Sequence, residues 1–267
     1  MKNIKLLISY DGTGYLGWQR LGGKQQGQSI QGLLEHVIEK VVQYPVRIHG
    51  SGRTDAGVHA KGQVANFSVP SAFFTLEETV EERLRYLRDE CNQRLPEDIR
   101  IIKAKLVAAS FHSRYSAKRK TYQYYIDTGE TPSVFARKYA LWVPQKLDIE
   151  KMKQAAEVLL GTHDFSGFSS KSKAGMQKKK RDTVRTLFAV DILPWKYGVY
   201  VSFTGDGFLY NMVRIMVGTL LEMAAGRRSY DDIPAVFAAG DRMAAGATAP
   251  ARGLILDRVF YDPEALD

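Results

Sequence analysis

The spacing of apolar residues along the chain predicts several helices. After Ser29, apolar side chains recur every three or four positions as far as Val42, and Pro45 ends the pattern, so a helix with one buried face is predicted there. A second, more highly charged helix is predicted over residues 76–95. Three further helices are predicted over residues 149–160, 210–225 and 231–239.

Short apolar or alternating runs bounded by turn residues predict the strands. They lie at residues 3–10, 46–49, 63–69, 99–107, 121–126, 184–192, 199–204 and 254–260. Several neighbouring runs are joined by short turns, which favours antiparallel pairing and an α+β class over a doubly wound parallel sheet. Because the order of strands and helices restarts near residue 108, we expect an N-terminal domain over 1–107 and a C-terminal domain over 108–267.

Composition narrows the possible functions. The 267 residues include 38 Lys and Arg against 29 Asp and Glu, and the net charge of +9 favours polyanionic partners, although many basic proteins bind no nucleic acid. The N-terminal apolar run is too short for a secretion signal, and no stretch reaches the roughly 18 apolar residues of a membrane span, so we expect a cytoplasmic protein. The single cysteine, Cys91, excludes an intramolecular disulfide and disfavours a cysteine-ligated metal site.

One glycine pattern has the spacing of a dinucleotide site but lacks its context. Gly12, Gly14 and Gly17 match G-x-G-x-x-G and follow a predicted strand. A dinucleotide site needs a helix that begins within the motif, so that its N-terminus faces the pyrophosphate. Here the next helix waits until Ser29, which favours a plain glycine turn between a strand and a loop.

The stretch at residues 51–59 is the strongest candidate for chemistry. Gly52 and Gly57 bracket Arg53 and Asp55 between two apolar runs, so the loop can hold a carboxylate at the edge of a sheet with tight backbone control. Arg53 can keep a nearby carboxylate ionised. The residues leave open the alternative of an Asx-type turn with a surface charge pair.

A first basic cluster combines cations with aromatic rings. Lys118 and Arg119 precede a run in which Tyr122 and Tyr124 share one face of a predicted strand. Phosphates favour the cations and unstacked bases favour the rings, which suggests RNA binding. The alternative is that the tyrosines belong to the core of a half-buried strand.

A second basic cluster lies at residues 171–185. It holds seven cations, among them Lys178, Lys179 and Lys180, against the single acid Asp182. Such a segment is suited to gripping a phosphate backbone, and a solvated charged loop is the alternative.

Arg214 is the one cation of an otherwise apolar predicted helix. A cation in that setting usually needs a carboxylate or an anion as a partner. Glu222, on the same helix, is two turns away and poorly placed for this. An arginine whose head reaches the surface is the alternative.

Five motifs in this order resemble those of the tRNA pseudouridine synthase A family. They are similar to its opening motif, its active-site loop, its second and third motifs and its C-terminal signature, at residues 10–19, 52–60, 111–122, 208–214 and 249–254. The likeness runs from about Lys5 to Tyr261, nearly the whole chain. No departure removes a residue that the family uses.

The resemblance implies an isomerase that converts uridine to pseudouridine in the anticodon stem-loop of tRNA, at positions 38, 39 and 40, with neither metal nor organic cofactor. It implies a homodimer of two-domain α/β subunits, each with a central mainly antiparallel sheet and a cleft between its domains. Asp55 would be the catalytic nucleophile, at C1′ of ribose or C6 of uracil, or a base at C2′. Arg214 would pair with Asp55, Tyr122 would stack on the target uracil, and Arg53 would fill the space that the flipped base leaves.

Two other classes of function are weighed against this one. A non-catalytic RNA-binding protein could use the same basic and aromatic surface, but Asp55 would then repel RNA from a phosphate-facing site. A nucleotide-dependent oxidoreductase built on residues 12–17 would show the absorbance of bound NAD, and we expect none.

Overall fold

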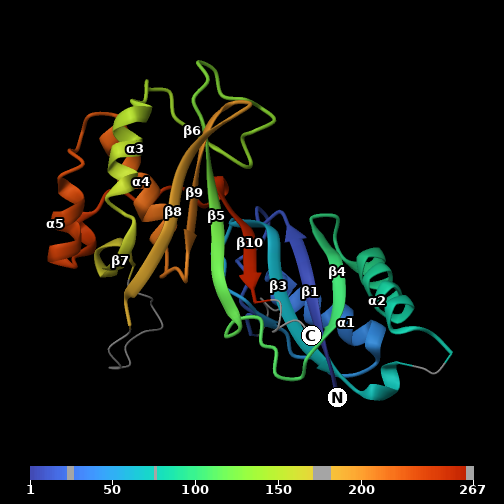
Figure 1. Cartoon of the computed structure of the whole chain (residues 1–267). Helices are drawn as coiled ribbons and strands as arrows, with labels where there is room; N and C mark the ends of the chain where they lie inside the picture. Colours follow the sequence, from blue (N-terminus) through green and yellow to red (C-terminus); the bar gives the residue numbers. More distant parts are fainter. Residues whose placement is uncertain (23–26, 75–76, 171–181, 263–267) are drawn as a thin grey trace. The chain divides into compact units, whose positions relative to one another are not determined.

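The chain folds into two compact units in the computed structural model of Figure 1. The structure describes residues 1–22, 27–74, 77–170 and 182–262. The first unit comprises Met1–Lys118 together with Ile255–Asp267, and the second comprises Arg119–Leu254. The end of the chain therefore belongs with its beginning.

A mainly antiparallel sheet forms the base of the first unit. Its strands are β1 (Lys2–Tyr10), β2 (His49–Gly50), β3 (His59–Val69), β4 (Ile99–Val107) and β10 (Leu254–Tyr261). Their order is β4-β1-β3-β10, and β2 also pairs with β3. β1 runs antiparallel to β3 and β4, whereas β10 is parallel to β3, with Ile255 opposite His59.

Helices α1 (Ile30–Val42) and α2 (Val80–Arg94) complete the core of this unit, and they pack against one another. Alternate residues of β1 enter the core, since Ile4, Leu6 and Ile8 are fully buried. Ser29 caps α1 by accepting a hydrogen bond from the Gly32 N–H. Thr79 and Glu82 form a capping box at the start of α2.

The strands of the second unit pair antiparallel in the order β5 (Ala117–Asp127), β9 (Gly198–Gly205), β8 (Val184–Trp195) and β7 (Gly161–Asp164). The short β6 (Leu141–Trp142) pairs with β5 in parallel. Three helices, α3 (Ile149–Glu157), α4 (Met212–Ala224) and α5 (Asp232–Ala239), belong to the same unit. Nearly all of α4 is buried, and α3 packs against it. The predicted α+β class with mainly antiparallel sheets is confirmed.

The predicted strand at residues 46–49 is wrong over most of its length, because only His49 lies in β2. Side chains of α1 bind the backbone of this segment instead. Glu39 accepts the Val46 N–H at 3.1 Å, and Glu35 accepts the Ile48 N–H at 3.0 Å. The backbone groups that a strand would pair with a neighbour are therefore already satisfied.

Two short strands, β6 and β7, were not predicted. β7 is polar and four residues long, so it has no hydrophobic period of its own. It forms only by pairing with β8, where the hydroxyls of Thr162 and Thr186 are 2.8 Å apart.

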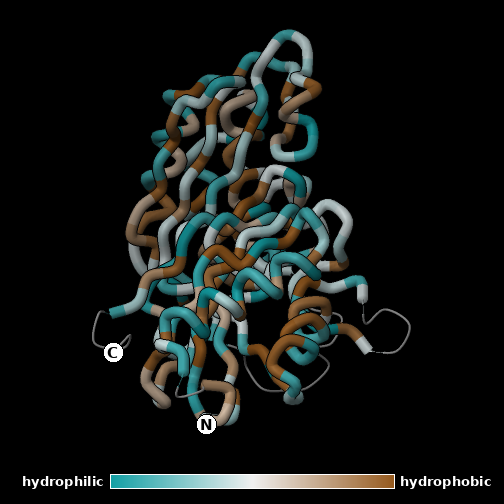
Figure 2. The backbone as a smooth tube through the Cα atoms, turned by 90° about the vertical axis from the view of Figure 1, so that its right-hand side faces the viewer, coloured by the Kyte–Doolittle hydropathy of each residue, from teal (hydrophilic) through white to brown (hydrophobic). Residues whose placement is uncertain are grey.

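Hydrophobic and hydrophilic segments alternate along the same strands and helices in Figure 2, as expected for elements with one buried side.

Cys91 lies fully buried on α2. Across the described ranges, no helix is long and apolar enough to cross a membrane.

Candidate active site

The Asp55 loop, residues 51–58, connects β2 to β3 in the first unit. Asp55 is half-buried, and its carbonyl accepts the Val58 N–H at 3.1 Å, which closes the turn. Gly57 has a φ of 76°, a left-handed conformation that glycine adopts without steric cost. The backbone on both sides of the Asp55 carboxylate is thus bent into a defined shape.

The opening motif at residues 10–19 is packed directly on the Asp55 loop. The Trp18 N–H donates to the Thr54 carbonyl at 3.0 Å, and the Gly57 N–H donates to the Tyr15 carbonyl at 3.3 Å. These two hydrogen bonds hold the loop one residue before and two residues after Asp55. Two motifs that lie far apart in the sequence therefore form one structure.

The glycines of the opening motif permit this contact. A Cβ at Gly12 would lie 2.0 Å from the Val58 carbonyl oxygen, and one at Gly17 would lie 2.6 Å from that of Thr54. Gly17 also has a φ of 98°, which side chains disfavour. The G-x-G-x-x-G spacing thus serves close packing on the Asp55 loop, and α1 begins only at Ile30, as the glycine-turn interpretation predicts.

A buried polar network supports the same loop from below. The Tyr10 hydroxyl and Thr54 Oγ1 are 2.8 Å apart. Gln63 donates from Nε2 to the Gly52 carbonyl at 2.9 Å, and its Oε1 accepts from the Ser51 hydroxyl at 2.8 Å. Burial raises the pKa of Tyr10 to about 12, so its phenol stays protonated and keeps this hydrogen bond at physiological pH.

His59 connects the end of the loop to the opening turn. Its ring is buried, and Nδ1 lies 3.0 Å from Asp11 Oδ1 and 3.1 Å from the Gly12 nitrogen. Arg53, in contrast, is exposed at the surface beside Asp55. The Asp55 loop therefore carries the acidic side chain of Asp55 and the basic side chain of Arg53, and hydrogen bonds to the opening motif hold its backbone in place.

Tyr122 belongs to the second unit, on β5. Its side chain is 7% exposed and meets Phe208 edge-on, with ring centroids 5.1 Å apart and ring planes at 78°. Tyr124 is fully buried on the same side of the strand and donates its hydroxyl to the Pro250 carbonyl at 2.8 Å. Both tyrosines are therefore buried, as the core interpretation predicts, and the Tyr122 ring also contacts an aromatic ring of the third motif.

Two hydrogen bonds hold the Arg214 side chain near the start of α4. Its Nε donates to the Ala249 carbonyl at 2.7 Å and its terminal nitrogen to Asn211 Oδ1 at 2.9 Å. Asn211 is itself in the left-handed conformation, with a φ of 61°. The third motif and the C-terminal signature are therefore joined through this guanidinium. Glu222 pairs with Arg228 and not with Arg214.

The cations that we expect to contact an RNA backbone differ in their surroundings. Lys118 is exposed and pairs with Asp262 at 3.0 Å, and the guanidinium of Arg119 lies 4.6 Å from the ring centre of Phe188. Lys178, Lys179 and Lys180 lie outside the described residues. Their predicted roles, like the predicted pairing of Arg214 with Asp55, stay predictions.

Sequence reasoning assigned no supporting role to several residues that hold this site, although most of them lie within the motifs it named. Tyr10, Ser51 and Gln63 hold the Asp55 loop, and Asn211 with Ala249 holds Arg214. A polar Gln63 within an otherwise buried strand was the available signal, because a buried amide requires hydrogen-bond partners. The identity of those partners is a property of the tertiary structure.

Comparison with known proteins agrees with the motif order. A family model described as tRNA pseudouridine synthase matches residues 6–116 and 155–262. A tRNA pseudouridine synthase A of Clostridium kluyveri is 44% identical over 98% of this chain and 100% of the relative. The tRNA pseudouridine synthase A of an Exiguobacterium species is 44% identical over 98% of this chain and 99% of the relative. That of Syntrophotalea carbinolica is 42% identical over 99% of this chain and 98% of the relative.

Among solved structures, the crystal structure of a Cbf5-Nop10-Gar1 complex overlaps loosely, with a TM-score of 0.37 at 12% identity. The match covers 97% of this chain and 50% of that chain. The curated relatives are more than 40% identical to this chain over nearly its full length, and the family model matches most of the sequence. The chain therefore belongs to the tRNA pseudouridine synthase A family of isomerases.

Proposed function

We propose that this chain isomerises uridine to pseudouridine in the anticodon stem-loop of tRNA, with Asp55 as the catalytic nucleophile. The observation that carries the proposal is the support of the Asp55 loop. Thr54 and Gly57, on either side of Asp55, are each bound through the backbone to the opening motif, and Thr54 is bound again through its hydroxyl to Tyr10. A carboxylate held this way can be preorganised toward one atom of the substrate.

The reaction breaks the N1–C1′ bond of uridine, turns the uracil and joins C5 to C1′. The C5 proton is lost and N1 gains a proton, so atoms and electrons balance without an oxidant, a reductant or a hydrolytic water. An ionised Asp55 supplies the reactive group that these reaction steps need from the protein, as a nucleophile at C1′ or C6 or as a base at C2′. We propose that no metal or organic cofactor takes part.

Arg214 is proposed to pair with the Asp55 carboxylate. Arginine stays charged at all physiological pH values, and an adjacent cation holds a carboxylate in its ionised form. The two hydrogen bonds to Ala249 and Asn211 fix the plane of the guanidinium, which supports this role because a bidentate pair requires a fixed orientation.

Tyr122 is proposed to stack on the target uracil. Its edge-on contact with Phe208 restrains the ring, so little conformational entropy is lost when a base stacks on it. Base stacking contributes about 1–3 kcal/mol, which offsets much of the few kcal/mol needed to extrude a nucleotide. Exposed Arg53 would occupy the space left in the RNA stack.

Lys118, Arg119 and the segment with Lys178, Lys179 and Lys180 are proposed to contact the tRNA backbone. Each neutralised phosphate strengthens binding at low salt, so these contacts would show in the salt dependence of the dissociation constant. We further propose that the enzyme acts as a homodimer in the cytoplasm.

The test is pseudouridine formation in unmodified tRNA transcripts, mapped by position, with no metal added. We expect the wild type to modify uridines of the anticodon stem-loop, and Asp55→Asn to bind the same transcripts without converting any. Asp191→Asn, which removes an exposed carboxylate on β8, is the matched control and should keep full activity. Binding by the wild type without pseudouridine on any transcript would instead establish a non-catalytic RNA-binding protein.

A further inference from the structure

Four side chains from four strands form a row across the sheet of the first unit. Lys105 of β4 is directly opposite Lys5 of β1, and Lys5 is directly opposite Asn66 of β3. Asn66 in turn is opposite His49 of β2. Directly opposed residues of antiparallel strands point to the same face, so the row lies on the face opposite the buried Ile4.

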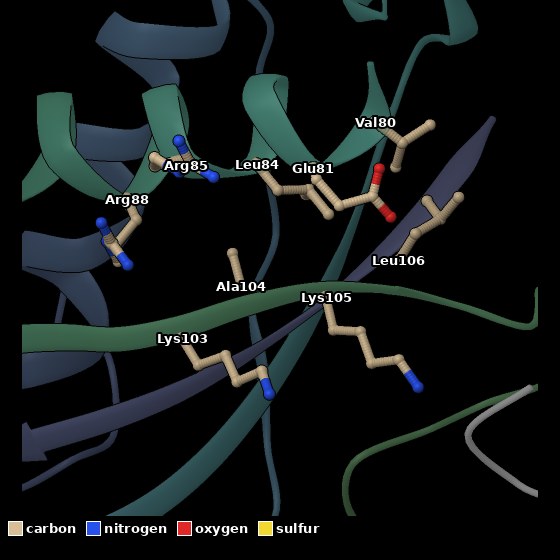
Figure 3. A pocket seen from close by; sticks show the side chains of 9 residues that line it. All are labelled: Val80, Glu81, Leu84, Arg85, Arg88, Lys103, Ala104, Lys105 and Leu106. Atoms are coloured by element: carbon tan, nitrogen blue, oxygen red, sulfur yellow. The ribbon is translucent and has the colours of Figure 1, made fainter.

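Lysines extend this row along the edge of the sheet. Figure 3 shows that Lys103 and Lys105 point away from α2, whereas Ala104 and Leu106 point toward it. All four are among the residues that line a groove of about 380 Å³. Burial, and then the charges of Lys105 and Lys103, lower the pKa of Lys5. Within the described part of the chain, none of these three lysines pairs with a carboxylate.

The segment 111–116 is fastened onto the same face. Asn66 accepts the Ser113 N–H at 2.9 Å, and the Ser113 hydroxyl donates to the His49 carbonyl. Phe111 lies under the ammonium of Lys5, whose Nζ is 5.6 Å from the ring centre. The row of polar side chains thus fixes a loop beside the lysines.

This loop completes a ladder of three rings, which we call the ring ladder: His49, His112 and Tyr115. The ring centres of His49 and His112 are 5.0 Å apart, and those of His112 and Tyr115 are 4.4 Å apart, with planes tilted by 43° and 38°. The Tyr115 side chain is 76% exposed, and the guanidinium of Arg114 lies 5.7 Å from its ring centre.

The middle ring of the ladder is held in a neutral form. The Arg114 backbone N–H donates to His112 Nδ1 at 3.1 Å, so this nitrogen accepts and carries no proton. Burial and the neighbouring charge of His49 also lower the pKa of His112. The ladder therefore offers a fixed aromatic surface whose outer end, Tyr115, is open to solvent.

We propose that the ring ladder binds an unpaired base of the substrate RNA, distinct from the uridine that reaches Asp55, while Lys5, Lys103 and Lys105 hold the adjoining phosphates. The identification of this RNA as the tRNA substrate rests on the function proposed above. Proteins bind single-stranded nucleic acid with this combination, in which aromatic faces stack the bases and a cationic track follows the backbone. Because His49 and Asp55 belong to one continuous strand–loop segment, the ladder is a fixed reference point for the RNA that enters the site.

The first experiment compares two RNAs that differ only in unpaired bases. One is a hairpin with the loop of the anticodon arm, and the other is a blunt duplex with the sequence of the same stem. Dissociation constants are measured by fluorescence anisotropy for the wild type, Tyr115→Ala, Tyr115→Phe and the control Tyr44→Ala, whose tyrosine is 41% exposed. Thermal unfolding of each variant confirms that it folds.

We expect Tyr115→Ala to weaken hairpin binding by about 5- to 150-fold, the effect of losing one stacked base, and to leave duplex binding unchanged. Tyr115→Phe keeps the ring and should bind both RNAs like the wild type. Lys105→Gln should weaken both RNAs alike and reduce the slope of log Kd against log salt, because it removes a phosphate contact. Equal losses on hairpin and duplex for Tyr115→Ala, or no loss on either, would overturn the proposal.

A covalent readout identifies the contact independently. Hairpins carrying 5-iodouridine at single loop positions are irradiated with the protein, and the crosslinked peptide is identified by mass spectrometry. Crosslinks to Tyr115 or His112 from one loop position support the ladder, and crosslinks confined to other segments at every position argue against it. Pseudouridine formation is scored separately, so a chain that crosslinks at the ladder but makes no pseudouridine refutes the proposed activity and not the ladder.

Discussion

The Tyr10 phenol and the Thr54 hydroxyl lie 2.8 Å apart beneath the Asp55 loop, and both side chains are almost fully buried. Tyr10 is the last residue of β1, and Thr54 directly precedes Asp55. The strand at the start of the chain therefore reaches the loop through one hydrogen bond between side chains. Any movement of β1 relative to this loop would displace Asp55.

Removing this hydrogen bond should reduce the rate of the chemical step more than RNA affinity. We expect Tyr10→Phe to lower kcat by about 10-fold, with a dissociation constant for tRNA like that of the wild type, because the loop loses one constraint and the RNA loses none. The loss in stability should be about 1 kcal/mol. Single-turnover kinetics with the enzyme in excess over tRNA, together with urea unfolding, measure both effects, and Tyr44→Phe serves as the control. An increase in KM with unchanged kcat would contradict this account.

Gly17 should not tolerate a side chain, because its φ is 98° and a Cβ would lie 2.6 Å from the Thr54 carbonyl oxygen. We expect Gly17→Ala to destabilise the fold by about 1–3 kcal/mol and to abolish most activity by displacing the Asp55 loop. Gly14→Ala is the matched control, since a Cβ there meets nothing within 4 Å. Urea denaturation of the two variants gives the comparison, and equal midpoints would show that the contact is not needed.

Lysine should be a poor replacement for Arg214. It keeps the charge but lacks the planar fork that binds Ala249 and Asn211 at the same time. We expect Arg214→Lys to lower kcat on the order of 100-fold, as for a misplaced catalytic neighbour, with tRNA binding largely retained. Arg227→Lys, at an exposed position after α4, serves as the control. Full activity of Arg214→Lys would show that charge alone suffices at this position.

Alkaline pH should destabilise the fold through buried acids on the first unit. Burial raises the pKa of Cys91 from 9.0 to about 12, and that of Tyr10 from 10.0 to about 12. The unfolded chain releases these protons first, so their contribution to stability is complete below about pH 9 and is lost as the pH rises toward 12. Urea unfolding at pH 8 and pH 11 measures the loss, and Cys91→Ala should make it smaller. An unchanged pH slope in Cys91→Ala would show that the thiol titrates normally.

The buried thiol should also be inert in the folded protein. Cys91 is fully buried, and its raised pKa keeps it protonated at neutral pH. We expect a disulfide reagent to react with it at the rate of unfolding, and to react at once in denaturant. Immediate modification of the native protein at pH 8 would contradict the buried position.

Much of the first unit follows from local rules. The period of α1, its Ser29 cap and the alternation of β1 each predict the observed element, because side-chain direction repeats with the backbone. Local rules fail at residues 46–48, where Glu35 and Glu39 from α1 take the place of a neighbouring strand. They also fail at β7, which has no pattern until β8 pairs with it.

The sequence by itself determined the α+β class, the order of the motifs, the family and the candidates Asp55, Tyr122 and Arg214, because these depend on residue types and spacing along one chain. Only the tertiary structure decided that Gly12 and Gly17 pack on the Asp55 loop and that Arg214 binds the carbonyl of Ala249. Contacts of this kind join residues that are tens of positions apart, and they form only when strands pair and buried polar groups find partners.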